Sequence, residues 1–142
     1  MRAPVILHRM KKRGGPGVVM LNLAGPATID EVEPFLLRLF DDRELIQLPM
    51  QSLLGRFLAK RRVPKVHALY QGIGGGSPIV HWSRAQGEGM CERLDRVSPE
   101  TAPHRFCIAF RYTAPFTDDA LSAMEDDGVE RAVAFTQYPQ YS

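Results

Sequence analysis

The sequence is poor in cysteine and contains no long apolar run. Its 142 residues include only Cys91 and Cys107, which form no CxxC pair, so we exclude a disulfide framework and a four-cysteine metal site within the chain. No apolar run approaches the roughly 20 residues of a membrane-spanning helix. The net charge is only +2, which is too small to indicate a nucleic-acid-binding protein. These absences leave a globular domain in a reducing compartment.

The chain has room for one compact domain, because domains average roughly 150 residues. Residues 1–16 carry several basic side chains and precede the first acidic residue, Asp30. We expect this segment to be disordered, and the remnant of an organellar presequence is the alternative. Residues 17–142 are then the folded domain.

Apolar patterning predicts strands that alternate with helices. Short apolar runs rich in β-branched residues predict strands, at residues 18–23, 106–112 and 131–136. Helical spacing of apolar residues predicts helices, at residues 32–40, 51–62, 64–70, 78–97 and from 117 to a stop at Gly128.

The helix boundaries rest on capping residues and prolines. Thr28 and Glu31 resemble a capping box, but Pro34 would then fall beyond the first turn, so the helix either begins near Pro34 or kinks there. Pro64 suits the first position of a new helix, and Thr117 is a typical N-cap.

This order of elements predicts an α/β domain with a parallel sheet flanked by helices and right-handed crossovers. Ligands of such open sheets bind beyond the carboxyl ends of the strands. Those ends carry Asn22 and Leu23, Arg111 and Tyr112, and Gln137 and Tyr138. Polar and aromatic groups therefore gather where the fold predicts a binding site.

Two further features have a functional and a structural interpretation. The loop at residues 72–77 matches neither the P-loop nor the Rossmann glycine pattern; its amides form either an anion nest or a tight connection. The basic residues Lys60, Arg61, Arg62 and Lys65 either hold the carboxylates of an acidic ligand or are solvated cations at a helix end. The four histidines show no metal-binding spacing, and no nucleophilic triad can be argued.

Several segments, taken in order, resemble the ferrochelatase family, with the closest likeness to its eukaryotic-type branch. They cover nearly the whole chain from about Gly17, and they are Met20–Pro26, Phe35–Phe40, Ala59–Arg62, Ile73–Pro78, Gln86–Met90, Phe110–Tyr112 and Ala134–Ser142.

The resemblance implies a Rossmann-like chelatase fold of two similar halves around a porphyrin cleft, of which this chain is the first half only. It implies insertion of ferrous iron, as substrate, into protoporphyrin IX to make protohaem, the last step of haem synthesis. The family's catalytic histidine and glutamate belong to the other, carboxyl-terminal half, so the resemblance assigns no catalytic residue and no metal ligand to this chain. We therefore expect this chain alone to be inactive.

The same resemblance assigns porphyrin contacts to named positions. Arg62, Tyr70 and Ser77 match porphyrin-contacting residues whose cation and hydroxyls suit the two propionates. The remaining positions are the cleft floor, at Arg111 and Tyr112, a variable cleft position, Leu23, and a hydrophobic lip, at Leu39, Phe40 and Leu45.

For the full-length protein, the resemblance leaves open a [2Fe–2S] cluster, a homodimer and contact with a membrane surface, and Cys91 and Cys107 do not match the cluster ligands. It implies the matrix side of the mitochondrial inner membrane for a eukaryotic protein and the cytoplasm for a bacterial one. The alternative to an enzyme fragment is a non-catalytic porphyrin-binding or interaction module from a truncated isoform.

Overall fold

A computed structural model describes residues 15–138, which divide into two units. The first unit comprises residues 15–23 and 81–138, and the second comprises residues 24–80. The predicted disordered start covers residues 1–16, of which residues 1–14 lie outside the described residues, as do residues 139–142. Residues 15 and 16 are described: Gly15 is buried, and the carbonyl of Pro16 accepts from the amide of Arg105 (3.1 Å).

The first unit is built on a parallel three-stranded sheet, as predicted. Its strands are β1 (Gly17–Asn22), β2 (Arg105–Phe110) and β3 (Ala132–Thr136), and the spatial order is β2-β1-β3. The ladder of β2 ends at Phe110, two residues before the predicted end. Parallel pairing places the carboxyl ends of all three strands at one edge.

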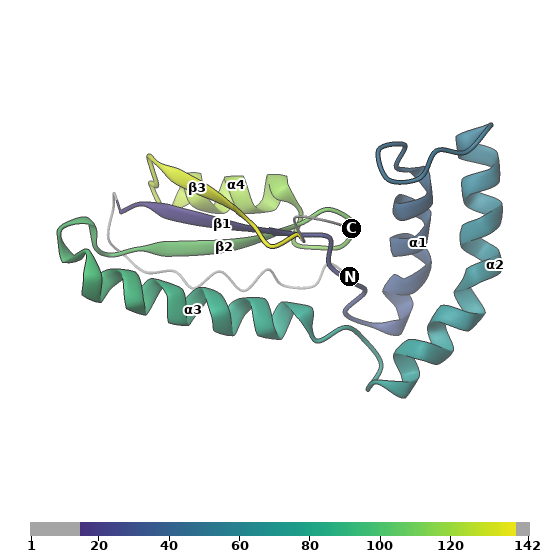
Figure 1. Ribbon diagram of the computed structural model, residues 1–142, viewed down its shortest axis with the longest axis horizontal. Coiled ribbons are helices and arrows are strands. Elements are labelled where there is room, and N and C mark those ends of the chain that lie inside the picture. The colour runs from purple at the N-terminus through teal and green to yellow at the C-terminus, as the bar shows by residue number, and fades with distance from the viewer. Residues whose placement is uncertain (1–14, 139–142) are drawn as a thin grey trace. The chain divides into compact units, whose positions relative to one another are not determined.

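Helices α3 (Ile79–Val97), of which all but the first two residues belong to this unit, and α4 (Thr117–Asp126) cover opposite faces of the sheet (Figure 1). Buried side chains of Val19, Cys107 and Ala109 pack against Ala120 and Met124 of α4. The other face meets α3 where Gly87 lies against the ring of Phe106. These contacts bury β1 and β2.

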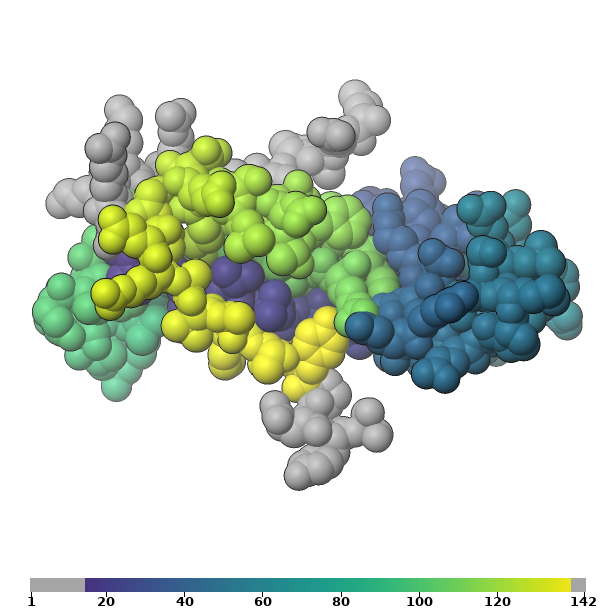
Figure 2. Space-filling view, turned by 90° about the horizontal axis from the view of Figure 1, so that it is seen from above, coloured from purple at the N-terminus to yellow at the C-terminus, as the bar shows by residue number. Residues whose placement is uncertain are grey.

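Strand β3 differs from its neighbours, because all five of its residues are exposed. Val133 and Phe135 are 60% and 47% exposed. The space-filling view shows the β3 segment, in yellow, on the surface of this unit (Figure 2). Among residues 15–138, β1 is the one strand that pairs with β3.

The second unit is a helical hairpin. A 3-10 turn, η1 (Ile29–Glu31), leads into α1 (Val32–Asp41), and α2 (Gln51–Gly72) packs against α1. The buried core of this unit consists of Val32, Leu36, Phe40 and Ala59. The buried amide of Gln51 donates to the carbonyl oxygens of Phe40 (2.7 Å) and Ile46 (2.9 Å). It thereby satisfies a carbonyl at the end of α1 that has no partner within the helix.

Residues 51–72 form one helix, so the prediction of two short helices separated at Pro64 was wrong. Pro64 lies inside α2 and has no amide hydrogen to donate to the carbonyl of Lys60, one turn earlier. Both residues are exposed. Water can solvate that carbonyl, and the helix continues with a bend, as Figure 1 shows.

The predicted capping box at Thr28 does not form, and the alternative, a helix that begins near Pro34, is confirmed; the predicted N-cap at Thr117 was wrong. Thr28 precedes η1 without a capping hydrogen bond from its side chain, and Glu31 accepts instead from the amide of Ala27 (2.9 Å). Helix α1 begins at Val32, so Pro34 falls in its first turn, where it is tolerated. Thr117 is the first residue of α4, and Asp119 accepts from the amide of the N-cap residue Phe116 (3.0 Å). Helix α4 stops before Gly128, as predicted.

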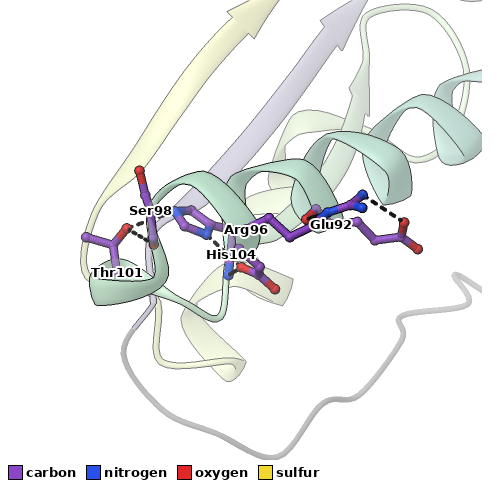
Figure 3. A network of polar contacts seen from close by, with 6 residues as sticks. Glu92, Arg96, Ser98, Thr101 and His104 are labelled. Carbon is purple, nitrogen blue, oxygen red and sulfur yellow. Dashed lines mark hydrogen bonds and ion pairs between the residues drawn. The ribbon is translucent and has the colours of Figure 1, made fainter.

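A polar network connects the end of α3 with the start of β2 (Figure 3). Asp95 accepts hydrogen bonds from the backbone amide of His104 (2.8 Å) and from its Nδ1 (2.7 Å). His104 Nε2 lies 3.0 Å from Thr101 Oγ1, which donates to the carbonyl of Ser98. The backbone hydrogen bond from His104, followed by the one from its ring, lowers the pKa of Asp95 below its usual 3.8.

We predict that Gly87→Ala destabilises the protein. A Cβ at this position would lie 2.2 Å from Cδ2 of the Phe106 ring, so the helix or the ring must move, at a cost of about 1–3 kcal/mol. Urea unfolding measures the loss. Gly89→Ala in the same helix is the control, since its Cβ meets nothing within 4 Å; an equal effect of both substitutions would contradict the packing.

We also predict that Asp95→Asn destabilises the protein in a pH-dependent manner. Because folding lowers the pKa of Asp95, its charge stabilises the folded state above pH 3.8, and the stabilisation is lost as the pH falls through the lower, folded-state pKa. The difference in unfolding free energy between wild type and variant should therefore shrink below pH 3.8.

The control for this prediction is Glu92→Gln. The ion pair of Glu92 with Arg96 is 3.9 Å long, and both side chains are exposed, so this substitution should change little at any pH. A difference for Asp95→Asn that is the same at neutral and acidic pH would refute the role of its charge.

Candidate functional site

The carboxyl edge of the sheet in the first unit holds a pocket of about 620 Å³. This is the edge at which a parallel α/β sheet is expected to bind a ligand. The lining comes from the ends of the strands and the start of α4, and consists of Leu21, Asn22, Ala109, Phe110, Arg111, Phe116, Thr117, Asp118 and Tyr138. The predicted gathering of strand-end residues is thus present for Asn22, Arg111 and Tyr138.

Arg111 is the predicted site residue that lines this pocket. Its amide donates to the carbonyl of Asn22 (3.2 Å), which continues the pairing of β2 with β1 by one residue. Its guanidinium carbon lies 5.8 Å from the centroid of the Tyr112 ring, a distance typical of a cation–π contact. This contact places the exposed guanidinium of Arg111 at the carboxyl edge of the sheet.

Tyr112 and Leu23, also predicted as porphyrin contacts, are not among the lining residues. Tyr112 is 3% exposed, and its ring packs against the guanidinium of Arg111. Leu23 is half-buried. Tyr138 and Asp118 do line the pocket; Tyr138 was predicted at this edge of the sheet but was given no porphyrin contact, and Asp118 was not predicted there. The position of Tyr138 directly after a strand was the available signal for it; the position of Asp118 depends on where α4 packs.

In the second unit, Tyr70 and Ser77 meet at Gly25. A Cβ built on the buried Gly25 would lie 2.8 Å from Tyr70 Oη and 3.2 Å from Ser77 Oγ. The two predicted ligand-binding hydroxyls therefore approach one point. Burial raises the pKa of Tyr70 above its usual 10.0, so at neutral pH this phenol remains a hydrogen-bond donor.

The glycine loop makes this meeting possible. Gly74 and Gly75 have φ values of +99° and +93°, which glycine adopts without steric cost. The backbone amides of Ile73 and Gly75 donate to the carbonyl oxygen of Tyr70, and the amide of Gly74 donates to the carbonyl oxygen of Gln71. These three amides close the end of α2, and they are not available for an anion nest.

Beyond that turn, the loop lies against the chain that follows β1. The Ser77 amide donates to the carbonyl of Pro26 (2.7 Å), and a Cβ on Gly76 would lie 1.9 Å from the carbonyl oxygen of Ala27. Ser77 Oγ also accepts from the amide of Ile79 (3.4 Å) at the start of α3. Of the two interpretations of the loop, the structure supports the tight connection.

Arg62 is exposed on α2, and its guanidinium carbon lies 5.6 Å from the centroid of the Phe40 ring. The basic cluster around it is also exposed. Phe40, predicted as a lip residue, is instead buried in the helical core, and Leu39 is half-buried against that core. Leu45 is the predicted lip residue with a largely exposed side chain, at 53%.

The cysteines do not fit an iron–sulfur cluster. Cys91 lies on α3 and Cys107 is buried in β2; burial is the main cause that raises both pKa values to about 11, which disfavours the thiolates that ligate metals. Within residues 15–138, no three His, Cys, Asp or Glu side chains lie close enough to hold a metal ion. In the same part of the chain, no helix has the length and apolar character to cross a membrane.

Comparison with known proteins identifies the family. The Ferrochelatase family model matches residues 15–142. The chain is 58% identical over 126 residues to "Ferrochelatase, mitochondrial" of Gallus gallus, an alignment that covers 89% of this chain and 31% of that protein. The protein of the same name from Homo sapiens is 56% identical over 132 residues, with 93% and 31% covered. The one from Schizosaccharomyces pombe is 54% identical over 131 residues, with 92% and 31% covered.

The chain thus spans about a third of the length of these curated relatives. The family model, in contrast, matches almost the entire chain, from Gly15 to Ser142. The chain belongs to the ferrochelatase family.

Proposed function

We propose that the protein to which this chain belongs is a ferrochelatase, which inserts ferrous iron into protoporphyrin IX to make protohaem. The family match over residues 15–142 is the observation that carries this proposal. In the reaction, Fe²⁺ enters the macrocycle and the two pyrrole N–H protons leave, so a general base must accept them. We give that role to no residue of this chain, in line with the resemblance that places the catalytic histidine and glutamate in the other half.

The contribution of this chain is to bind and orient the porphyrin. Protoporphyrin IX combines a flat apolar ring with two propionate carboxylates. The carboxylates need cations and hydrogen-bond donors, which Arg62, Tyr70 and Ser77 offer. We assign contacts along the ring to Arg111 and its neighbour Tyr112, and to Leu23, Leu39 and Leu45. Phe40 is buried in the helical core, and we infer that it acts by packing under Arg62.

The relatives' names place them in mitochondria, and we propose the same compartment here, on the matrix side of the inner membrane. For the complete protein we also propose a homodimer in contact with the membrane surface and a [2Fe–2S] cluster held by cysteines other than Cys91 and Cys107.

The function is tested by an iron-insertion assay on the complete protein. Fe²⁺ and protoporphyrin IX under anaerobic conditions should give the haem absorbance spectrum with loss of porphyrin fluorescence. Porphyrin binding without iron insertion would contradict the enzyme and favour a non-catalytic porphyrin-binding protein.

We predict that Arg62→Ala weakens porphyrin binding by the complete protein. Loss of a hydrogen bond between a cation and a carboxylate costs about 1.5–3 kcal/mol, which raises Kd roughly tenfold or more. A fluorescence titration measures Kd. Arg61→Ala is the matched control, because Arg61 is the adjacent exposed arginine of the same helix; unchanged binding by Arg62→Ala, or an equal loss for both variants, would refute the role of Arg62.

A further inference from the structure

Gly25 lies at the point where the two hydroxyls of the second unit converge. It is buried three residues after the end of β1, beside Tyr70 in the last turn of α2 and Ser77 in the loop that leads to α3. An added Cβ would meet Tyr70 Oη at 2.8 Å, Ser77 Cβ at 3.1 Å and Ser77 Oγ at 3.2 Å. All three atoms belong to Tyr70 and Ser77, the two side chains that we propose bind the porphyrin propionates through their hydroxyls.

The other close glycine of this region differs in what it meets. A Cβ on Gly76 would collide with the backbone of Ala27, at 1.9 Å from its carbonyl oxygen, so Gly76 serves the packing of two main-chain segments. A Cβ on Gly25 would meet side-chain atoms, and the nearest is the far end of Tyr70. A side chain at residue 25 would thus displace the Tyr70 and Ser77 hydroxyls, whereas one at residue 76 would displace the backbone.

We infer that Gly25 is a positioning and specificity-determining residue, whose missing side chain keeps Tyr70 Oη and Ser77 Oγ close enough to bind one carboxylate group together. This inference rests on the proposed function. A carboxylate offers two oxygens to two donors, and both hydroxyls can donate. Tyr70 is uncharged at neutral pH, because a tyrosine ordinarily titrates near pH 10.0 and burial raises its pKa further, so it does not repel the anion.

A methyl group at residue 25 would push the Tyr70 hydroxyl away and occupy part of the space between the donors. We therefore expect Gly25→Ala in the complete protein to raise the Kd for protoporphyrin IX roughly tenfold, as for the loss of one hydrogen bond to a charged group. The dimethyl ester of protoporphyrin IX, which lacks both carboxylates, should bind to wild type and variant alike. Gly72→Ala is the control, because a Cβ there meets nothing within 4 Å.

A double-mutant cycle with Tyr70→Phe tests the mechanism. Tyr70→Phe removes the oxygen that the Cβ would meet at 2.8 Å, so Gly25→Ala should weaken binding much less in the Tyr70→Phe background than in wild type. Equal losses in both backgrounds would overturn the inference, and so would an equal loss of affinity for the dimethyl ester.

The outcomes separate this inference from the proposed function. If Tyr70→Phe and Ser77→Ala weaken binding of the free acid but Gly25→Ala does not, the inference alone is overturned. If neither hydroxyl variant weakens binding, the carboxylate role of this cluster fails and the inference fails with it. Should Gly25→Ala fail to fold, the variant that also carries Tyr70→Phe must fold, and its failure would overturn the inference.

Discussion

The chain that leaves β1 and the loop between α2 and α3 run in backbone contact, and the predicted ligand contacts of the second unit depend on this approach. The hydrogen bond from the Ser77 amide to the Pro26 carbonyl joins the two segments. Gly76 permits their contact because any side chain there would collide with Ala27. As a result, Ser77 comes beside Gly25, and Tyr70, at the end of α2, reaches the same point.

The first unit applies a different constraint. Parallel pairing of β1 with both neighbours brings three strand ends to one edge, and the pocket lies at that edge. Burial of Tyr112 beneath the Arg111 guanidinium supports an exposed cation at that edge. The two units thus offer different chemistry: a cation beside apolar and aromatic strand ends in one, and a pair of neutral hydroxyls with an arginine on α2 in the other.

Much of this could be predicted from the sequence, because local patterns determine it. The strands are short β-branched runs, and their order with the helices indicates the parallel sheet and its binding edge. What could not be predicted depends on distant partners. Whether Pro64 ends a helix depends on the exposure of the carbonyl it leaves unpaired, and the burial of Phe40 depends on the packing of α1 against α2. The importance of Gly25 depends on Tyr70 and Ser77, which are about 50 residues away.

The most direct test of this account is a crystal structure of the complete protein with protoporphyrin IX bound. In that structure, oxygens of one propionate should lie within about 3 Å of Tyr70 Oη and Ser77 Oγ, the distance of a charge-assisted hydrogen bond. A bound porphyrin whose two propionates both lie elsewhere, with these hydroxyls bonded only to protein or water, would contradict it.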